Sequence, residues 1–502
     1  MRRRDFLRTG VSGGAAGLVA WGAAVEPPAV MAEEPAAGNA PAIFASHRGE
    51  DHRLRLQNIA FCEKAISSCM RKHLITNYVP AQACYNLGEY PSRARWEPNA
   101  SDEQELDRLR DHGIQLIQLF DDWNDSLRLF GGHKLRAINP DGFRRFVSMV
   151  HQRGMKVIAY ISTGFIQRTD PDFRAEWSRE GDFLELGYWN MARCSPASAG
   201  WRAYLLPHII HVLDDYGLDG LYDDGGYVTN AQKSAAPPTP DEVLAFEESA
   251  DFDGALTDLL SLVYAEVKRR GGIFKLHVNG ADAPLTRGAK VYDYLWVGEG
   301  VNNTDLLREK VKNYPPYVVP CIDMTFATTE TRDDAYLHAV PYMQFPVLQA
   351  GRPFTGERAM APGVAYAKDD FWMKRCREIW AYYQAHPDGP YVYGGWDTFP
   401  PRPEDRPTHA RWLKRYLPLV EQGTYAWIEV GGSNLFTEPL PKDTVASVFA
   451  NRDVYVVLAN YGHEPVEVTT SDAYVRADDP SAAPEKCWRL AARSLEILRR
   501  CT

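Results

Sequence analysis

Four strand-like runs of this 502-residue sequence end in carboxylic acids. In chain order the acids are Asp121 and Asp122, Asp223 and Asp224, Glu299, and Asp323. A single Asp after a strand carries little information, because Asp is a common turn residue. Carboxylates that converge from several strands repel one another unless they serve a substrate, a metal or a proton transfer. The set therefore predicts one shared site with chemistry of that kind.

Hydrolysis of a glycosidic bond is a reaction that needs two carboxyl groups. One carboxylate attacks or stabilises the anomeric carbon, and the other acid protonates the departing oxygen. Retention of configuration requires the two groups about 5 Å apart, and inversion requires roughly 6.5–9.5 Å. The residue types therefore favour a glycoside hydrolase, with the stereochemistry left open.

A repeated unit is expected to position these acids. In each copy an amphipathic helix ends at a Gly, which permits the left-handed turn that stops a helix, and a β-rich run follows at once. Helix starts are also marked, by a capping box at residues 101–104 and by the pair Asn139-Pro140. Eight strands are expected in all, at residues 74–80, 114–120, 155–161, 218–222, 273–278, 292–297, 317–324 and 342–349.

Repeated helix–Gly–strand units predict parallel strands with crossover helices, and eight strands predict a (β/α)8 TIM barrel. A doubly wound open sheet is the alternative, which is weakened because no Gly-rich phosphate loop follows the first strand. In a barrel, catalytic groups lie at the carboxyl ends of the strands, where the acids of this chain fall.

The chain is too long for one compact core and predicts a barrel with a smaller domain. Short β-type runs after about residue 425 predict a C-terminal antiparallel, β-sandwich-like domain at residues 425–502. The expected barrel, with a helical extension, covers residues 71–424. An N-terminal linker and helix cover residues 33–70, and residues 1–32 are expected to be removed.

The N-terminus predicts export. Arg3-Arg4-Asp5-Phe6-Leu7 resembles the bacterial twin-arginine motif, an apolar stretch spans residues 11–25, and a cleavage site is expected after Ala32. We therefore expect the twin-arginine machinery as a partner, a periplasmic or extracellular location, and no membrane anchor in the mature chain.

Composition narrows the partners. A net charge of −10 argues against nucleic acid and anionic membranes. The 13 Trp and 26 Tyr suit either a sugar-binding cleft or simply a large core. None of the eight Cys forms a CxxC pair, so a structural zinc site is not expected, and no cofactor is expected.

Two segments resemble retaining α-glycosidase barrels of the α-galactosidase, α-glucosidase and α-fucosidase types. Residues 217–224 look like their fourth-strand motif, in which the nucleophile follows a first Asp by five positions. Counted from Asp219, the resemblance implies Asp224, rather than Asp223, as the nucleophile. Residues 120–123 are similar to the Asp-Asp-Gly-Trp string of α-galactosidases, without its Gly, which implies that Asp121 and Asp122 bind sugar hydroxyls.

The same families place the acid/base after a late strand, often as an Asp. Glu299 is the candidate here, although its residue type departs from the α-galactosidase pattern, and Asp323 is the fallback. The resemblance covers roughly residues 70–360. Further substrate contacts are expected from Trp123, Asp223, His277, Asn279, Trp296 and Asp323, with core packing as the alternative for His277 and Trp296.

These observations predict an exported, retaining glycoside hydrolase that acts on an oligosaccharide or polysaccharide and is similar to α-galactosidases. A non-catalytic carbohydrate-binding barrel is one alternative, against which the presence of both Asp224 and Glu299 argues. A metal-dependent hydrolase on the same fold is the other. Barrel metal sites usually draw on several His at strand ends, and His277 alone is visible there.

Overall fold

The computed structural model describes residues 49–75, 78–87, 96–126, 128, 130–186, 189–225, 252–277, 290–297, 308, 310–312, 314, 319–323, 333–351 and 406–501. The expected signal peptide lies outside the described residues. Within the described part of the chain, no helix is both long and apolar enough to cross a membrane.

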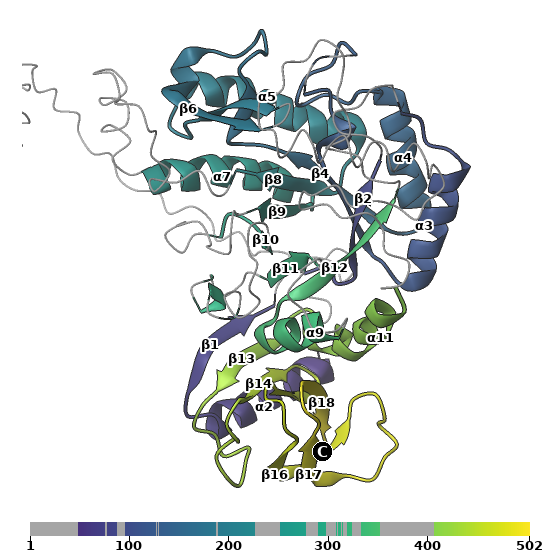
Figure 1. The fold of residues 1–502 in the computed structure, drawn as a ribbon, viewed down its shortest axis with the longest axis vertical. Helices are drawn as coiled ribbons and strands as arrows, with labels where there is room; N and C mark the ends of the chain where they lie inside the picture. The colour runs from purple at the N-terminus through teal and green to yellow at the C-terminus, as the bar shows by residue number, and fades with distance from the viewer. Residues whose placement is uncertain are drawn as a thin grey trace, which may run out of the picture.

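Among the described residues, eight parallel strands close into a barrel in the order β10-β11-β12-β2-β3-β4-β8-β9 (Figure 1). Their bounds are β2 (Gln82–Asn86), β3 (Leu116–Leu119), β4 (Lys156–Ile161), β8 (Gly220–Asp224), β9 (Ile273–His277), β10 (Tyr294–Val297), β11 (Val319–Asp323) and β12 (Phe345–Gly351). The helices α3 (Ala100–His112), α4 (Pro140–Gln152), α5 (Ala199–Tyr216) and α7 (Phe252–Arg269) connect barrel strands. The predicted TIM barrel is confirmed.

Local sequence signals explain where these helices begin and end. Gly113 and Gly217 take left-handed conformations after α3 and α5, as predicted. Asn139 caps α4 ahead of Pro140, also as predicted. The capping box of α3 starts two residues earlier than expected, because Asn99 and Asp102 form it.

The predicted first barrel strand is wrong. Residues 69–74 form β1 (Cys69–Leu74), which pairs antiparallel with the C-terminal strand β13 (Tyr425–Val430). The barrel strand is β2, which lies between β12 and β3. The strand β2 was missed because it carries the polar residues Gln82 and Asn86, which are buried and share one face of the strand.

An excursion that the sequence did not predict follows β4. The strands β5 (Phe165–Gln167), β6 (Ser178–Leu186) and β7 (Trp189–Cys194) form a small antiparallel sheet in the order β5-β7-β6. The chain then enters α5. This sheet therefore lies on the connection between β4 and β8, and β8 is the strand that ends in Asp223 and Asp224.

The C-terminal region forms a seven-stranded antiparallel sheet in the order β1-β13-β14-β15-β18-β16-β17, as Figure 1 shows below the barrel. Its later strands are β14 (Thr444–Ala450), β15 (Val454–Asn460), β16 (Val466–Arg476), β17 (Glu485–Leu490) and β18 (Ser494–Arg500). The helix α2 (Gly49–Ala65) packs on β14. The predicted C-terminal β domain is confirmed, with one strand supplied from residues 69–74.

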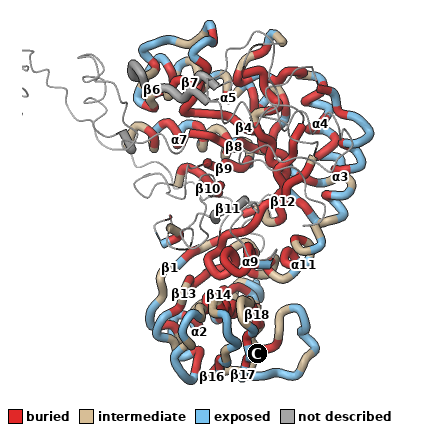
Figure 2. The backbone as a smooth tube through the Cα atoms, in the orientation of Figure 1, coloured by how far each residue is buried: buried red, intermediate tan, exposed pale blue. Residues whose placement is uncertain are grey.

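The remaining short helices join the two parts of the molecule. The helix α9 (Asp334–Ala339) contacts β18, and α11 (Arg406–Tyr416) leads into the C-terminal sheet. Arg493 donates to the buried carboxylate of Asp334 over 2.6 Å. Figure 2 shows the barrel strands other than β11 as mostly buried, with exposed backbone concentrated on the outer helices and loops. Side chains fill the interior of such a barrel, so a reactive site is expected at the rim formed by the carboxyl ends of the strands.

Candidate active site

Asp224 is the last residue of β8 and is held by both neighbouring strands. The hydroxyl of Tyr160, on β4, donates to its Oδ2 over 2.7 Å. The Nδ1 of His277, at the end of β9, lies 3.1 Å from its Oδ1. Because β8 pairs in register with β4 on one side and β9 on the other, the barrel itself sets this geometry. The arrangement fixes a carboxylate at the rim, as a nucleophile requires.

The surroundings of Asp224 keep it ionised. Burial alone raises the pKa of this carboxyl group, but the hydrogen bond and charge of His277 lower it. The hydroxyl of Tyr160 and the positive charge of Lys134 act in the same direction. The net pKa of Asp224 lies below its ordinary value. Only the ionised carboxylate can attack an anomeric carbon, so the environment favours the reactive form.

Removing the Tyr160 hydroxyl should weaken this arrangement. We expect Tyr160→Phe to lower kcat/KM about 10- to 100-fold, because one hydrogen bond to a charged group is lost. Since that bond stabilises the carboxylate, the pKa of Asp224 should rise, and the acid limb of the kcat/KM profile should move to higher pH. A pH–rate profile of both enzymes measures the shift.

Tyr455→Phe, in the C-terminal sheet, is the matched control and should leave the limb in place. An unchanged acid limb in Tyr160→Phe would mean that the hydroxyl does not tune Asp224.

Asp223, the residue before Asp224 on β8, bonds the segment that follows β4. Its Oδ1 accepts from the backbone N–H of Thr163 and its Oδ2 from the Thr163 hydroxyl, each over 2.8 Å. The residue has no exposed surface. Trp201 of α5 in turn donates to the Thr163 carbonyl over 2.8 Å. The structure therefore shows the carboxylate of Asp223 bonded to Thr163, and its predicted substrate contact stays a prediction.

Burial raises the pKa of Asp223 to about 7, against the bonds from Thr163. An unfolded Asp titrates near pH ~3.9, so between these values the folded chain holds a proton that the unfolded chain has released. Stability should then fall as pH rises from about 4 to 7, by at most ~1.4 kcal/mol per pH unit for this group. Asp223→Asn should remove that component, as urea unfolding of both proteins at several pH values would show. A constant difference between the two proteins across the window would contradict this assignment.

The acids of the second barrel strand have separate roles. Asp122 is fully buried, and its Oδ2 accepts from the backbone N–H of Leu87, just beyond β2. Asp121 is half-buried, and its negative charge raises the pKa of Lys134, against the effect of burial. The predicted hydroxyl contacts of both residues remain predictions, and the structure adds that Asp122 anchors backbone.

Trp123 does not line a pocket. Its ring is fully buried, stacks on Phe143 of α4 at a centroid distance of 4.9 Å, and meets Tyr216 of α5 edge-on. Its Nε1 donates to the carbonyl of Tyr160 over 2.8 Å. The structure therefore packs the ring of Trp123 between α4 and α5, and its predicted substrate contact stays a prediction.

Trp296 packs inside the barrel. Its ring meets Phe120, Tyr222 and His277 edge-on and has no exposed surface. The structure therefore shows the Trp296 ring packed in the core, and its predicted substrate contact stays a prediction. His277 ends β9, and its ring contacts Tyr222 and hydrogen-bonds Asp224.

The other predicted residues are only partly placed. Glu299 and Asn279 lie outside the described residues. Asp323 ends β11 and pairs in register with Val347 of β12, so its backbone lies at the predicted strand end. No group of three or more His, Cys, Asp or Glu side chains within the described ranges could hold a metal ion. The roles of Glu299, Asn279 and Asp323 stay predictions.

One residue near Asp224 was not predicted. Lys134 lies in the connection between β3 and α4, is almost fully buried, and contributes positive charge to Asp224. Its sequence neighbours, Gly131-Gly132-His133 and Leu135-Arg136, are those of an ordinary polar turn. Nothing in that string distinguishes an inward-facing lysine from an exposed one.

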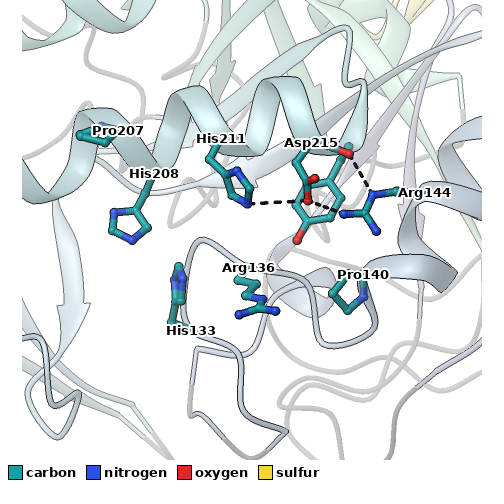
Figure 3. Close-up of a pocket in the computed structure, with 9 residues that line it drawn as sticks. His133, Arg136, Pro140, Arg144, Pro207, His208, His211 and Asp215 are labelled. Atoms are coloured by element: carbon teal, nitrogen blue, oxygen red, sulfur yellow. Dashed lines mark hydrogen bonds and ion pairs between the residues drawn. The ribbon is translucent and has the colours of Figure 1, made fainter.

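A separate pocket of about 480 Å³ lies on the outer wall of the barrel, between α5 and the segment from residue 133 to α4 (Figure 3). Arg144 of α4 bonds Asp215 of α5 there over 2.6 Å, and His211 lies 3.7 Å from the same carboxylate. None of the predicted site residues lines it. The pocket therefore does not compete with Asp224 as the catalytic position.

No protein-family model matches the chain, and no curated protein matches it in sequence. Solved structures share its fold. An α-glucosyl transfer enzyme, XgtA, superposes with a TM-score of 0.51 at 12% identity, over 84% of this chain and 100% of that one. A mutant of the trehalulose synthase MutB, in complex with Tris, gives 0.49 at 13% identity, over 84% and 99%.

A GH36 α-galactosidase from Geobacillus stearothermophilus, a variant of AgaA in complex with 1-deoxygalactonojirimycin, is also similar. Its TM-score is 0.48 at 9% identity, over 84% of this chain, and the chain spans only 56% of that α-galactosidase. At 12% identity the superposition on XgtA shows a shared fold alone.

Proposed function

We propose that the protein is an exported, retaining glycoside hydrolase with Asp224 as nucleophile and Glu299 as acid/base. The observation that carries the proposal is the ionised carboxylate of Asp224, held by Tyr160 and His277 at the carboxyl end of the fourth barrel strand. The barrel shared with an α-glucosyl transfer enzyme supports the same reaction class.

The proposed reaction has two steps. Asp224 attacks the anomeric carbon and forms a glycosyl ester, while the glycosidic bond breaks and Glu299 gives its proton to the leaving oxygen. Glu299 then takes a proton from water, which attacks the same carbon and releases Asp224. Throughout, Tyr160 and His277 keep the attacking carboxylate oriented, and Asp121 binds a sugar hydroxyl.

The substrate is proposed to be an α-linked oligosaccharide or polysaccharide, with α-galactosides as the first to test. That choice rests on the acidic pair Asp121-Asp122 and its similarity to the α-galactosidase string.

The proposed location is periplasmic or extracellular, through twin-arginine export. Fractionation of cells that express the full chain and an Arg3→Lys, Arg4→Lys form tests export, which the double substitution should block.

A panel of α- and β-linked aryl glycosides tests the reaction. We expect turnover of at least one α-glycoside, with ¹H NMR showing the first product anomer as α. A first product of opposite configuration would exclude the retaining mechanism. Binding of sugars without any turnover would favour a carbohydrate-binding barrel, and activity abolished by a chelator would favour a metal-dependent hydrolase.

A further inference from the structure

Lys134 is a buried ammonium without a matched partner. Lys134 is only 4% exposed to solvent. The nearest acceptor is the Sδ of Met191, at 3.8 Å, and the ring of Tyr160 lies 5.6 Å away at its centroid. No carboxylate of the described residues lies within ion-pair distance of its Nζ, about 4 Å. A thioether is a weak acceptor, so three charged N–H donors are left almost unused.

Tyr160 places this ammonium near the nucleophile, because its ring centroid lies 5.6 Å from Nζ and its hydroxyl donates to Asp224. Burial lowers the pKa of Lys134, and the charges that oppose this most strongly are Asp224 and then Asp121. Both negative charges therefore act on the ammonium, yet neither carboxylate forms an ion pair with it. Leaving a buried charge in this state is costly, which is the arrangement expected where a ligand completes the hydrogen bonds.

The connection that carries Lys134 is built to hold it there. Asn124 and Ala137 pair as an antiparallel bridge, as do His133 and Arg136. The Oδ2 of Asp125 accepts from the backbone N–H groups of Phe130 and Gly132 over 2.9 and 2.7 Å. A Cβ on Gly132 would lie 2.7 Å from the Cβ of Asp125, so a glycine is needed for this fold of the turn. The two bridges and the hydrogen bonds of Asp125 thus stabilise the turn that carries Lys134, so its backbone is positioned before any ligand binds.

We propose that Lys134 is a specificity-determining residue that donates a hydrogen bond to one hydroxyl oxygen of the sugar bound at Asp224. The same hydroxyl donates its own hydrogen bond to the carboxylate of Asp121 or Asp224. A hydroxyl both accepts and donates, so it can bridge an ammonium and a carboxylate that do not touch. A substrate carboxylate fits less well, because it would add a third negative charge beside Asp121 and Asp224. The inference rests on the proposed glycosidase function.

Deoxy substrates test this contact. The best aryl glycoside of the wild-type enzyme is compared with analogues that each lack one hydroxyl, on wild type and on Lys134→Met. In wild type, one particular deoxy analogue should lose about 10- to 100-fold in kcat/KM through the missing charge-assisted bond. In Lys134→Met that same analogue should lose less than about threefold relative to the parent sugar, while the other analogues keep their wild-type penalties.

Stability supplies a second readout. Replacing a buried, unmatched ammonium by a thioether side chain of similar length should leave the melting temperature unchanged or raise it. The matched control is Lys275→Met, since Lys275 is also buried in the barrel but donates to Gln82 over 2.9 Å. That variant should lower the melting temperature and affect all analogues by one common factor.

The outcomes separate the inference from the proposed function. If wild type hydrolyses no glycoside, the proposed function fails, and this inference fails with it. If wild type is active but Lys134→Met keeps every deoxy penalty, Lys134 does not contact the sugar and the inference alone is overturned. If Lys134→Met does not fold, the lysine is structural, unless Lys134→Gln folds and abolishes the kcat/KM penalty of that one deoxy analogue.

Discussion

Asp224→Asn should lower kcat on an aryl α-glycoside by roughly 10⁴-fold or more, in line with the loss of other enzymatic nucleophiles. The amide is close in size to the carboxylate but cannot attack the anomeric carbon. It can still accept from Tyr160 through its carbonyl oxygen, so the fold around β8 should survive. Steady-state kinetics together with circular dichroism measure both effects.

Asp223→Asn is the matched control, one position away on the same strand. Because the carboxylate of Asp223 is spent on Thr163, this change should cost stability and less than about tenfold in kcat. Near-normal turnover in Asp224→Asn, or a larger kinetic loss in Asp223→Asn, would reverse the assignment of the two acids.

Glu299→Gln should show a loss that depends on the leaving group. General acid catalysis contributes about 10²- to 10⁴-fold, but a dinitrophenolate departs without a proton. We therefore expect a large loss in kcat/KM for a methyl or phenyl glycoside and a small loss for a dinitrophenyl glycoside. Added azide should restore turnover of the dinitrophenyl substrate, since it attacks the glycosyl ester without base catalysis and yields a glycosyl azide.

Asp323→Asn is the comparison for the acid/base, because Asp323 was the fallback from sequence. An equal loss for all leaving groups in Glu299→Gln, with leaving-group dependence in Asp323→Asn, would transfer the acid/base role to Asp323.

Much of the barrel followed from periodicity and glycine. The left-handed turns at Gly113 and Gly217 and the cap at Asn139 mark helix ends that the structure retains. The strand β2 could not be predicted because Gln82 and Asn86 lie on one of its faces. These polar residues do not follow the apolar pattern of the neighbouring strands. The antiparallel excursion β5–β7 escaped because it interrupts the repeat that revealed the other strands.

The site could be predicted in part. The resemblance favours Asp224 over Asp223 by its spacing from Asp219, and the structure adds that the two carboxylates have different partners, since Asp224 bonds Tyr160 and His277 and Asp223 bonds Thr163. The packing of Trp123 could not be predicted, because its position after a strand says nothing about which helices cover it. The roles of Tyr160 and His277 depend on which strands flank β8, and pairing order is a property of the closed barrel.

Lys134 shows the remaining limit. Its function depends on a turn that directs one side chain inward, and the ties that do so, from Asp125 to Phe130 and Gly132, are visible only in three dimensions. A residue of this kind carries no spacing signal, because it is positioned from a loop rather than from a strand.

The glycosyl ester on Asp224 can be trapped and identified. The enzyme is treated with an activated 2-deoxy-2-fluoro or 5-fluoro glycoside of the preferred sugar, digested, and analysed by tandem mass spectrometry. We predict a single fluoroglycosyl ester on the peptide that contains residues 203–233, with the fragment ions placing it on Asp224. A label on Asp223, on Asp323 or on any other residue of an inactivated enzyme would contradict the assignment of Asp224 as the nucleophile.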